Sequence, residues 1–260
     1  MKASYRLSLT ALFVIGLFVG GAPAQEKSEP ASTNNAAASA STPGAASPSA
    51  PPEAVSHVAT LAVSDLRDYE MQAPEVKRLL ARALSLTTLN LPYKYGSSDP
   101  KNGGMDCSGT VYYLLNEAGL KDVPRDASEM YKWVWTRGRF QAVVSSNPDT
   151  FELTPLKPGD LLFWTGTYRV DHDPPVTHVM IYLGVNRHSG RRVMVGASEG
   201  RRFNDVSRYG VSVFDFTMPG PRRSDAATEA SAADEPQSRF IGYGSVPGLE
   251  ETDGPENSKK

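Results

Sequence analysis

The first clear pattern in this chain is helical. Four apolar residues near the start of its middle region keep the spacing i, i+3, i+4, i+7 of one helix face: Val76, Leu79, Leu80 and Ala83. A second helix is expected to begin at Cys107 or Ser108 and to end near Gly119, because glycine is common just past helix ends. Its apolar face is formed by Val111, Leu114, Leu115 and Ala118.

Asp126 and Glu129 stand three residues apart, as in a capping box, and predict a third helix that runs through Trp133. After that helix the pattern changes to short runs rich in Val, Ile, Phe and Tyr, separated by Gly, Pro and Asn. The expected strands are Asp160–Trp164, His178–Leu183, Arg192–Ser198, Val211–Phe216 and Phe240–Val246. Helices followed by strands predict an α+β fold, with N-terminal helices packed on an antiparallel sheet of about five strands.

The first 24 residues have the three parts of a secretory signal peptide. Lys2 and Arg6 are basic, residues 7–19 are mostly apolar, and residues 22–24 read Ala-Pro-Ala at the expected cleavage site. We therefore expect an exported protein, periplasmic or extracellular, with no stable membrane insertion after the signal is cleaved. An uncleaved membrane anchor is the alternative.

Three other segments are poor in large apolar side chains, so they cannot bury enough surface to offset the entropy lost on ordering. Residues 25–57 predict a disordered tether rich in Ala, Ser and Pro. Residues 221–237 predict a disordered insertion, and residues 248–260 predict a disordered tail. One folded domain is expected between them, at residues 58–247.

Composition adds two constraints. The formal net charge of −2 does not favour nucleic acid as a partner. Oligomeric state is left open by the sequence. The chain has a single cysteine, which cannot form a disulfide within its own fold. Such a residue is either a small buried apolar group or a free thiol with a chemical role, and the count alone slightly favours the first.

The context of that cysteine favours the chemical role. Cys107 stands where the glycine-rich run 103–106 enters the second helix. Asp106 is a good N-cap candidate, because its carboxylate can accept bonds from the first free N–H groups. In the first turn, the helix dipole and those N–H groups favour a thiolate, the form that attacks a carbonyl. The same N–H groups are suited to bind an oxyanion.

A nucleophilic cysteine needs a base within hydrogen-bond reach. Among the four histidines, His178 opens an apolar strand and is well placed to face a cleft. His57 borders the tether, His172 lies in a proline-rich loop and His188 lies in a polar hairpin turn. His178 is therefore the expected base, and a histidine simply satisfied within the core is the alternative.

Four motifs together resemble the NlpC/P60 peptidases. In order they are Tyr-Lys-Tyr-Gly at 93–96, Met-Asp-Cys-Ser-Gly at 105–109, Pro-Gly-Asp-Leu-Leu-Phe at 158–163 and His-Val-Met-Ile-Tyr-Leu-Gly at 178–184. The resemblance runs from about residue 90 to 217, and the strand expected near 240 also fits it. Four motifs in this order are specific, whereas Asp-Cys-Ser-Gly alone is not.

The resemblance implies a papain-like core in which the nucleophile begins a helix packed on a sheet. It implies hydrolysis of peptidoglycan stem peptides, often between D-glutamate and a diamino acid, without a cofactor or metal. By position, Cys107 is the nucleophile and His178 the base. Tyr93 matches a tyrosine that lines the site. Asp106 and Ser108 match residues that hold the free amine of the substrate in some members.

One position departs from the family pattern. The family usually has a third polar residue, most often histidine, on the strand after the one that carries the base, and here that position is Gly196. A side chain from elsewhere is one replacement, with five candidates: His172, Asp171, Glu199, Asp205 and His188. A water or backbone carbonyl acting in a Cys–His dyad is the second possibility, and a weak or inactive enzyme is the third.

Other functions stay open from the sequence. A peptidase-like module that binds wall peptides without cutting them is compatible with Gly196. A thiol amidase or acyltransferase would pass through the same thioester as a hydrolase. A metal site formed by His172, His178, Asp171 and Asp173 is disfavoured, because their spacing is not a standard ligand pattern.

Overall fold

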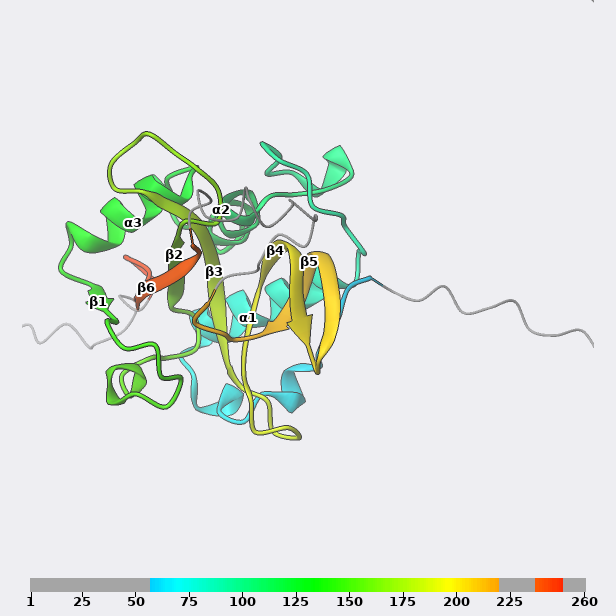
Figure 1. Ribbon diagram of the computed structural model, residues 1–260. Helices are drawn as coiled ribbons and strands as arrows, with labels where there is room; N and C mark the ends of the chain where they lie inside the picture. The colour runs from blue at the N-terminus through cyan, green and yellow to red at the C-terminus, as the bar shows by residue number, and fades with distance from the viewer. Residues whose placement is uncertain (1–56, 220–236, 250–260) are drawn as a thin grey trace, which may run out of the picture. The chain divides into compact units, whose positions relative to one another are not determined.

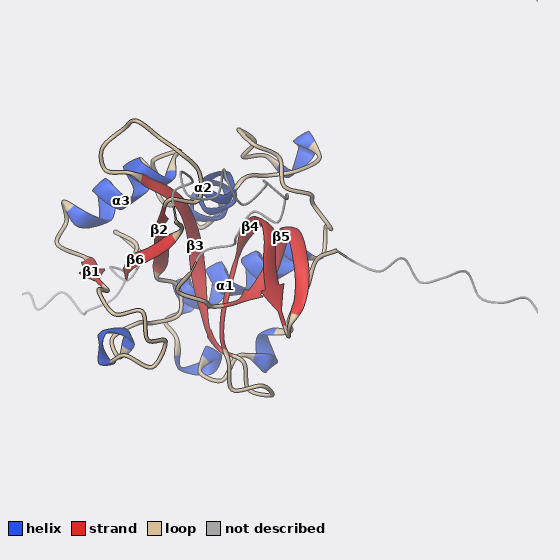
Figure 2. Cartoon of the chain, viewed as in Figure 1, coloured by secondary structure: helices blue, strands red, loops and turns tan. Residues whose placement is uncertain are grey.

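A computed structural model describes residues 57–219 and 237–249 of the 260-residue chain. These residues form the expected α+β fold, with three α-helices and a six-stranded antiparallel sheet (Figures 1 and 2). The expected signal peptide lies outside the described residues. So do nearly all of the tether, insertion and tail expected at 25–57, 221–237 and 248–260. Within the described ranges, we find no helix long and apolar enough to cross a bilayer.

All three expected helices are confirmed. Helix α1 is Pro74–Thr87, α2 is Cys107–Glu117 and α3 is Ala127–Trp135. The residues predicted to form the apolar face of α1 are buried. Helices α2 and α3 begin after aspartate N-caps, since Asp106 accepts a bond from the Gly109 N–H and Asp126 from the Glu129 N–H.

The five expected strands are also confirmed within a few residues. They are β2 (Leu161–Thr165), β3 (Val176–Val185), β4 (Arg192–Phe203), β5 (Val206–Asp215) and β6 (Arg239–Gly244). The sheet order is β1-β6-β2-β3-β4-β5. The additional strand β1 (Phe140–Ala142) has only three residues and pairs at one edge with β6. The expectation of about five strands was therefore one short, because three residues are too few to show an alternating pattern.

The two faces of the sheet are covered differently. Helix α1 contacts β4 and β5, α2 contacts β3 and β4, and α3 contacts β3 and β1. This helical face holds the main core, where Val179 and Ile181 of β3 pack with Leu114 and Leu115 of α2. Alternate residues of the same strands enter a second cluster of aromatic and methionine side chains on the other face, among them Trp164, Met180, Tyr182 and Phe214.

Candidate active site

Cys107 is the first residue of α2 and only 6% of it is exposed. The chain turns into this helix through Gly103, which has a left-handed φ of 77°. The Asp106 N–H then donates to the Ser97 carbonyl, 3.0 Å away, and the Asp106 carboxylate caps the helix through the Gly109 N–H. The local turn and cap therefore place the thiol at the start of the helix, as the sequence predicts.

Gly109 explains the glycine of the Asp-Cys-Ser-Gly motif. A Cβ atom at this position would overlap the backbone carbonyl of Ser97 and contact the Asp106 carboxylate. The helix therefore approaches the 97–106 loop closely only because residue 109 has no side chain. This close approach keeps Asp106 and Cys107 against the same loop.

Asp106 and Ser108 form a network with Arg125, a residue that no sequence pattern indicated. The Arg125 guanidinium donates from Nη1 to Asp106 Oδ1 at 3.2 Å and from Nη2 to Oδ2 at 2.9 Å. Nη1 also lies 2.9 Å from Ser108 Oγ, and the Gly96 N–H donates to Asp106 Oδ2 at 2.8 Å. Asp106 is thus both a helix cap and the partner of an arginine.

Strand β3 passes directly beside the thiol. Cys107 Sγ lies 4.0 Å from the Thr177 carbonyl oxygen, and the next residue is His178. His178 is 5% exposed, and its ring packs edge-on against Trp164, its register partner on β2, with 5.7 Å between ring centroids. The structure therefore places Cys107 at the start of α2 and His178 on the adjacent strand β3, one residue after the carbonyl that lies beside the thiol.

Burial keeps the thiol protonated at rest. Burial is the larger cause that raises the pKa of Cys107 to about 11, and the negative charge of the neighbouring Asp106 carboxylate is the second cause. Backbone N–H groups of Val179, Ser108 and Cys107 act in the opposite direction but do not prevail. The expectation of a thiolate at the helix start was therefore wrong for the resting site. The dipole effect at a helix end is about 1 kcal/mol, and removing a thiolate from water outweighs it.

His178 is held in its neutral form. Burial is the larger cause that places its pKa well below the usual value, and the positive charge of Arg201 is the second. Its Nε2 atom is buried and has no hydrogen-bond partner among the described residues. A neutral imidazole is the form that can accept a proton from the thiol.

Met180 fills the space that a side chain at position 196, the third position of the family pattern, would need. A Cβ atom at Gly196 would lie 3.0 Å from Met180 Cγ, so the methionine occupies the space beside this strand. Three of the five proposed replacements bind elsewhere: His172 Nδ1 contacts the Pro174 carbonyl, His188 contacts Asp65, and Asp205 contacts Arg191. The other two, Asp171 and Glu199, are exposed, whereas the imidazole is buried.

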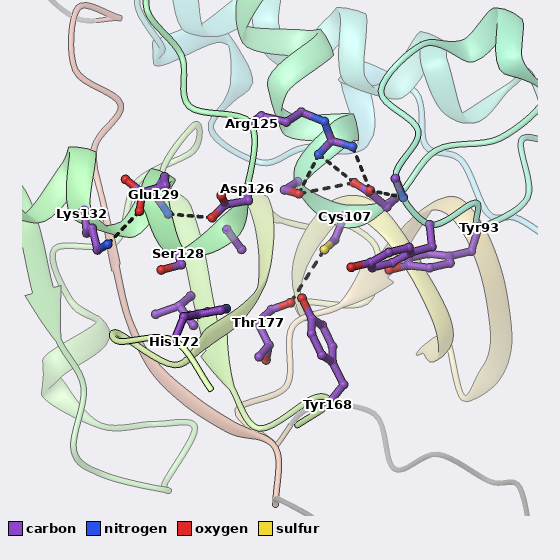
Figure 3. A pocket seen from close by; sticks show the side chains of 16 residues that line it. Tyr93, Cys107, Arg125, Asp126, Ser128, Glu129, Lys132, Tyr168, His172 and Thr177 are labelled. Carbon is purple, nitrogen blue, oxygen red and sulfur yellow. Dashed lines mark hydrogen bonds and ion pairs between the residues drawn. The ribbon is translucent and has the colours of Figure 1, made fainter. Parts of the chain in front are cut away.

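A cavity of about 520 Å³ opens in front of Cys107 (Figure 3). Tyr93 and Tyr168 form one side of it, and Asp126, Glu129, Lys132 and His172 line the other. Burial raises the pKa of both tyrosines, that of Tyr168 to about 12, and a negative charge on Cys107 adds to the effect. Both phenols thus stay protonated and can only donate to an anion near the sulfur. Tyr93 was expected at this wall, whereas nothing in the loop sequence indicated Tyr168.

Metal ligands are not gathered at this site or elsewhere in residues 57–219 and 237–249, where no group of three or more His, Cys, Asp or Glu side chains could hold an ion. His172 and His178 differ in environment, since only His172 lines the cavity and it is exposed.

The comparison with protein families decides the family. Residues 90–209, which contain Tyr93, Cys107 and His178, match the NlpC/P60 family model. This domain belongs to the NlpC/P60 family. The matched range covers α2, α3 and strands β1 to β4, so the family core includes both elements that carry the candidate catalytic pair.

Two curated relatives are similar to this NlpC/P60 domain over part of its length. Gamma-DL-glutamyl hydrolase of Bacillus subtilis (strain 168) is 29% identical over 140 residues, which are 54% of this chain. Murein DD-endopeptidase MepH of Escherichia coli (strain K12) is 36% identical over 93 residues, which are 36% of this chain. The chain spans only 28% of the length of either relative, so the similarity is confined to one part of those proteins.

Proposed function

We propose that this NlpC/P60 domain is a cysteine peptidase that hydrolyses amide bonds in peptidoglycan stem peptides. The observation that carries the proposal is a lone cysteine at the start of a helix, against the strand of a buried neutral histidine and beside a cavity of about 520 Å³. We further propose that the protein is exported, periplasmic or extracellular, and works at the cell wall. Sequence residues 1–24 and the murein-directed name of one relative support that location.

The reaction follows from the protonation states. His178 takes the proton from Cys107 Sγ as the sulfur attacks the amide carbon, forming an S–C bond and a tetrahedral oxyanion. The N–H groups of Cys107 and Ser108 are directed at the sulfur and are suited to stabilise that oxyanion. The imidazolium then gives its proton to the departing amine as the C–N bond breaks. Water hydrolyses the thioester and restores the thiol.

For the bond itself, we propose the link between D-glutamate and the diamino acid. The cavity offers both signs of charge on the side away from the tyrosines, with Lys132 in an ion pair with Glu129 at 2.7 Å and Asp126 beside them. A diamino acid carries an amine and a carboxylate and matches such a mixed surface. Arg125 and Asp106 also line the cavity and form an ion pair with each other. Asp106 is the carboxylate that we expected to bind the free amine of the substrate.

A non-catalytic wall-peptide-binding module is the second candidate, and one observation favours it. Position 196 has no side chain, and the buried His178 Nε2 atom has no partner among the described residues. A thiol amidase or acyltransferase on the same fold is distinguished only by the fate of the thioester.

The test is digestion of purified peptidoglycan by the full chain, followed by mass spectrometry of the products. Cys107→Ala and His178→Ala are expected to abolish cleavage, while His188→Ala, whose side chain is 71% exposed, leaves it unchanged. A new free amine on the diamino acid together with a new carboxylate on the D-glutamate identifies the proposed bond. Cleavage elsewhere in the stem overturns the bond assignment, and unchanged cleavage by Cys107→Ala overturns the peptidase mechanism. An added amine acceptor that appears in the product indicates transfer.

A further inference from the structure

Arg201 of β4 is a buried cation close to the proposed catalytic pair. Only 3% of the residue is exposed, although arginine is rarely buried without a partner. Its Nη1 atom donates to Thr217 Oγ1 over a long 3.4 Å. Its Nε and Nη2 atoms are buried and have no hydrogen-bond partner in the part of the chain that the structure describes. The guanidinium lies over an aromatic ring instead, with Cζ 4.4 Å from the centroid of Trp164.

The same Trp164 also packs against His178. The two rings stand edge to face with centroids 5.7 Å apart, and the residues are paired in the β2–β3 register. His178 Nε2 is a second buried polar atom for which the described residues supply no partner. A guanidinium and an imidazole, each with buried nitrogen atoms that lack a hydrogen-bond partner among the described residues, therefore contact the same tryptophan ring.

This arrangement does not serve stability. A buried charge with only one long hydrogen bond loses its hydration and recovers only part of that free energy through the aromatic face. Replacing such a charge with an apolar side chain of similar size is often neutral or stabilising. Arg201 lies over the same Trp164 ring that contacts His178, and this position points to an effect on the chemistry of the site.

We propose that Arg201 is a positioning residue that sets the charge balance of the proposed pair, disfavouring a proton on His178 and favouring a thiolate at Cys107, in a site that lacks a third catalytic side chain at Gly196. The inference rests on the proposed function of the Cys107–His178 pair. A fixed cation disfavours a second positive charge on the imidazole and favours the negative charge that forms on the sulfur. In the proposed attack, one proton moves from Sγ to the imidazole, and Arg201 neither gives nor takes one.

The ionisable surroundings of His178 are simple. Strand β4 contributes Arg201, and the Cys107 thiol of α2 lies beside the carbonyl of the preceding residue, Thr177. Strand β2 contributes Trp164, which contacts the imidazole and does not titrate, and Phe240 of β6 packs against Trp164. The pKa directions agree with this geometry, because Arg201 lowers the pKa of His178, and a Cys107 thiolate and Arg201 attract each other. Arg201 is thus the charged neighbour whose removal is expected to change the titration of His178.

The test compares Arg201→Met with Arg202→Met in the full chain. Arg202 is the adjacent exposed arginine, so its variant loses the same charge without touching the site. NMR titration of the histidine side chains, with the His178 signal assigned by its loss in His178→Gln, measures the protonation midpoint directly. We expect the protonation midpoint of His178 to lie well below the ordinary histidine value in the parent and in Arg202→Met, and to rise in Arg201→Met. The midpoint stays below 6.5 because burial remains the larger cause.

The pH profile of kcat/KM on peptidoglycan provides the second measurement. Its acid limb is expected to move up by the same amount in Arg201→Met and to stay in place in Arg202→Met. Arg201→Lys keeps the charge and is expected to keep the low midpoint, and Arg201→Gln replaces Arg201→Met if that variant does not fold. An unchanged His178 midpoint in the uncharged variants overturns the inference. If the parent cuts no peptidoglycan, the proposed function fails, while the NMR titration still decides the role of Arg201.

Discussion

Arg125 binds the carboxylate of Asp106 with both of its terminal nitrogens, at 3.2 and 2.9 Å. Asp106 is the N-cap of α2, and Arg125 directly precedes Asp126, the N-cap of α3. One ion pair therefore ties together the starts of two helices that meet at the cavity. The Asp106 side chain is only 8% exposed and lies next to the thiol, and the ion pair balances its negative charge.

Replacing Arg125 with alanine is expected to lower the free energy of unfolding by about 1–3 kcal/mol. The buried Asp106 loses a two-point partner, and the loss is moderated because the arginine itself is 36% exposed. Urea denaturation measures the change. Lys132→Ala is the control, because it breaks an ion pair with Glu129 whose side chains are 40% and 53% exposed and is expected to change stability by less than about 0.5 kcal/mol. Equal effects of the two substitutions would contradict a structural role for the Arg125 pair.

Gly109→Ala is expected to destabilise the domain by more than about 2 kcal/mol, because the new methyl group overlaps the Ser97 carbonyl and must push the loop from α2. Gly119→Ala serves as the comparison. Gly119 has a φ of 89°, and a Cβ atom there meets nothing within 4 Å, so only the conformational cost of about 1 kcal/mol applies. Thermal unfolding of both variants decides the matter, and a Gly109→Ala protein as stable as Gly119→Ala argues against the close approach.

Alkylation of Cys107 by iodoacetamide is expected to be slow at neutral pH and to keep accelerating above pH 9, because burial raises the pKa of the thiol to about 11. The unfolded chain in urea should instead show the midpoint of an ordinary thiol, about 8.5. The rate constant for the single cysteine is followed against pH by mass spectrometry. A plateau below pH 8 in the folded protein would establish a preformed thiolate and refute a neutral resting pair.

Histidine at position 196 is expected to fit only if Met180 is shortened. Gly196→His alone should lose about 1–3 kcal/mol, because its Cβ atom meets Met180 Cγ at 3.0 Å. Met180→Ala alone should lose about 2–5 kcal/mol through the cavity it leaves. In the double variant the smaller side chain at 180 makes room for the histidine. The double variant should therefore lose at least about 1 kcal/mol less free energy of unfolding than the sum of the two single losses. Strictly additive losses in a double-mutant cycle would show that Met180 does not fill the third position.

Much of the fold could be predicted because it depends on local patterns. The spacing of Val76, Leu79, Leu80 and Ala83 marks one face of α1, and Asp106 and Asp126 mark two helix starts. Strand β1 was missed, since three residues carry too little pattern to be recognised. Tyr168, Arg125 and Arg201 were missed as parts of the site for a different reason, because each reaches the cavity, Asp106 or the surroundings of His178 from a segment whose own sequence gives no sign of it.

The sequence by itself determined where Cys107 lies, at the start of a capped helix, and which strand carries His178. Both follow from caps and alternation that act within a few residues. Only the tertiary structure decided the charge on the pair. The dipole and N–H groups of α2 favour a thiolate, but burial and the Asp106 carboxylate keep the thiol neutral, and burial and Arg201 keep the imidazole neutral. Desolvation depends on which distant segments cover a group, and no local pattern records that.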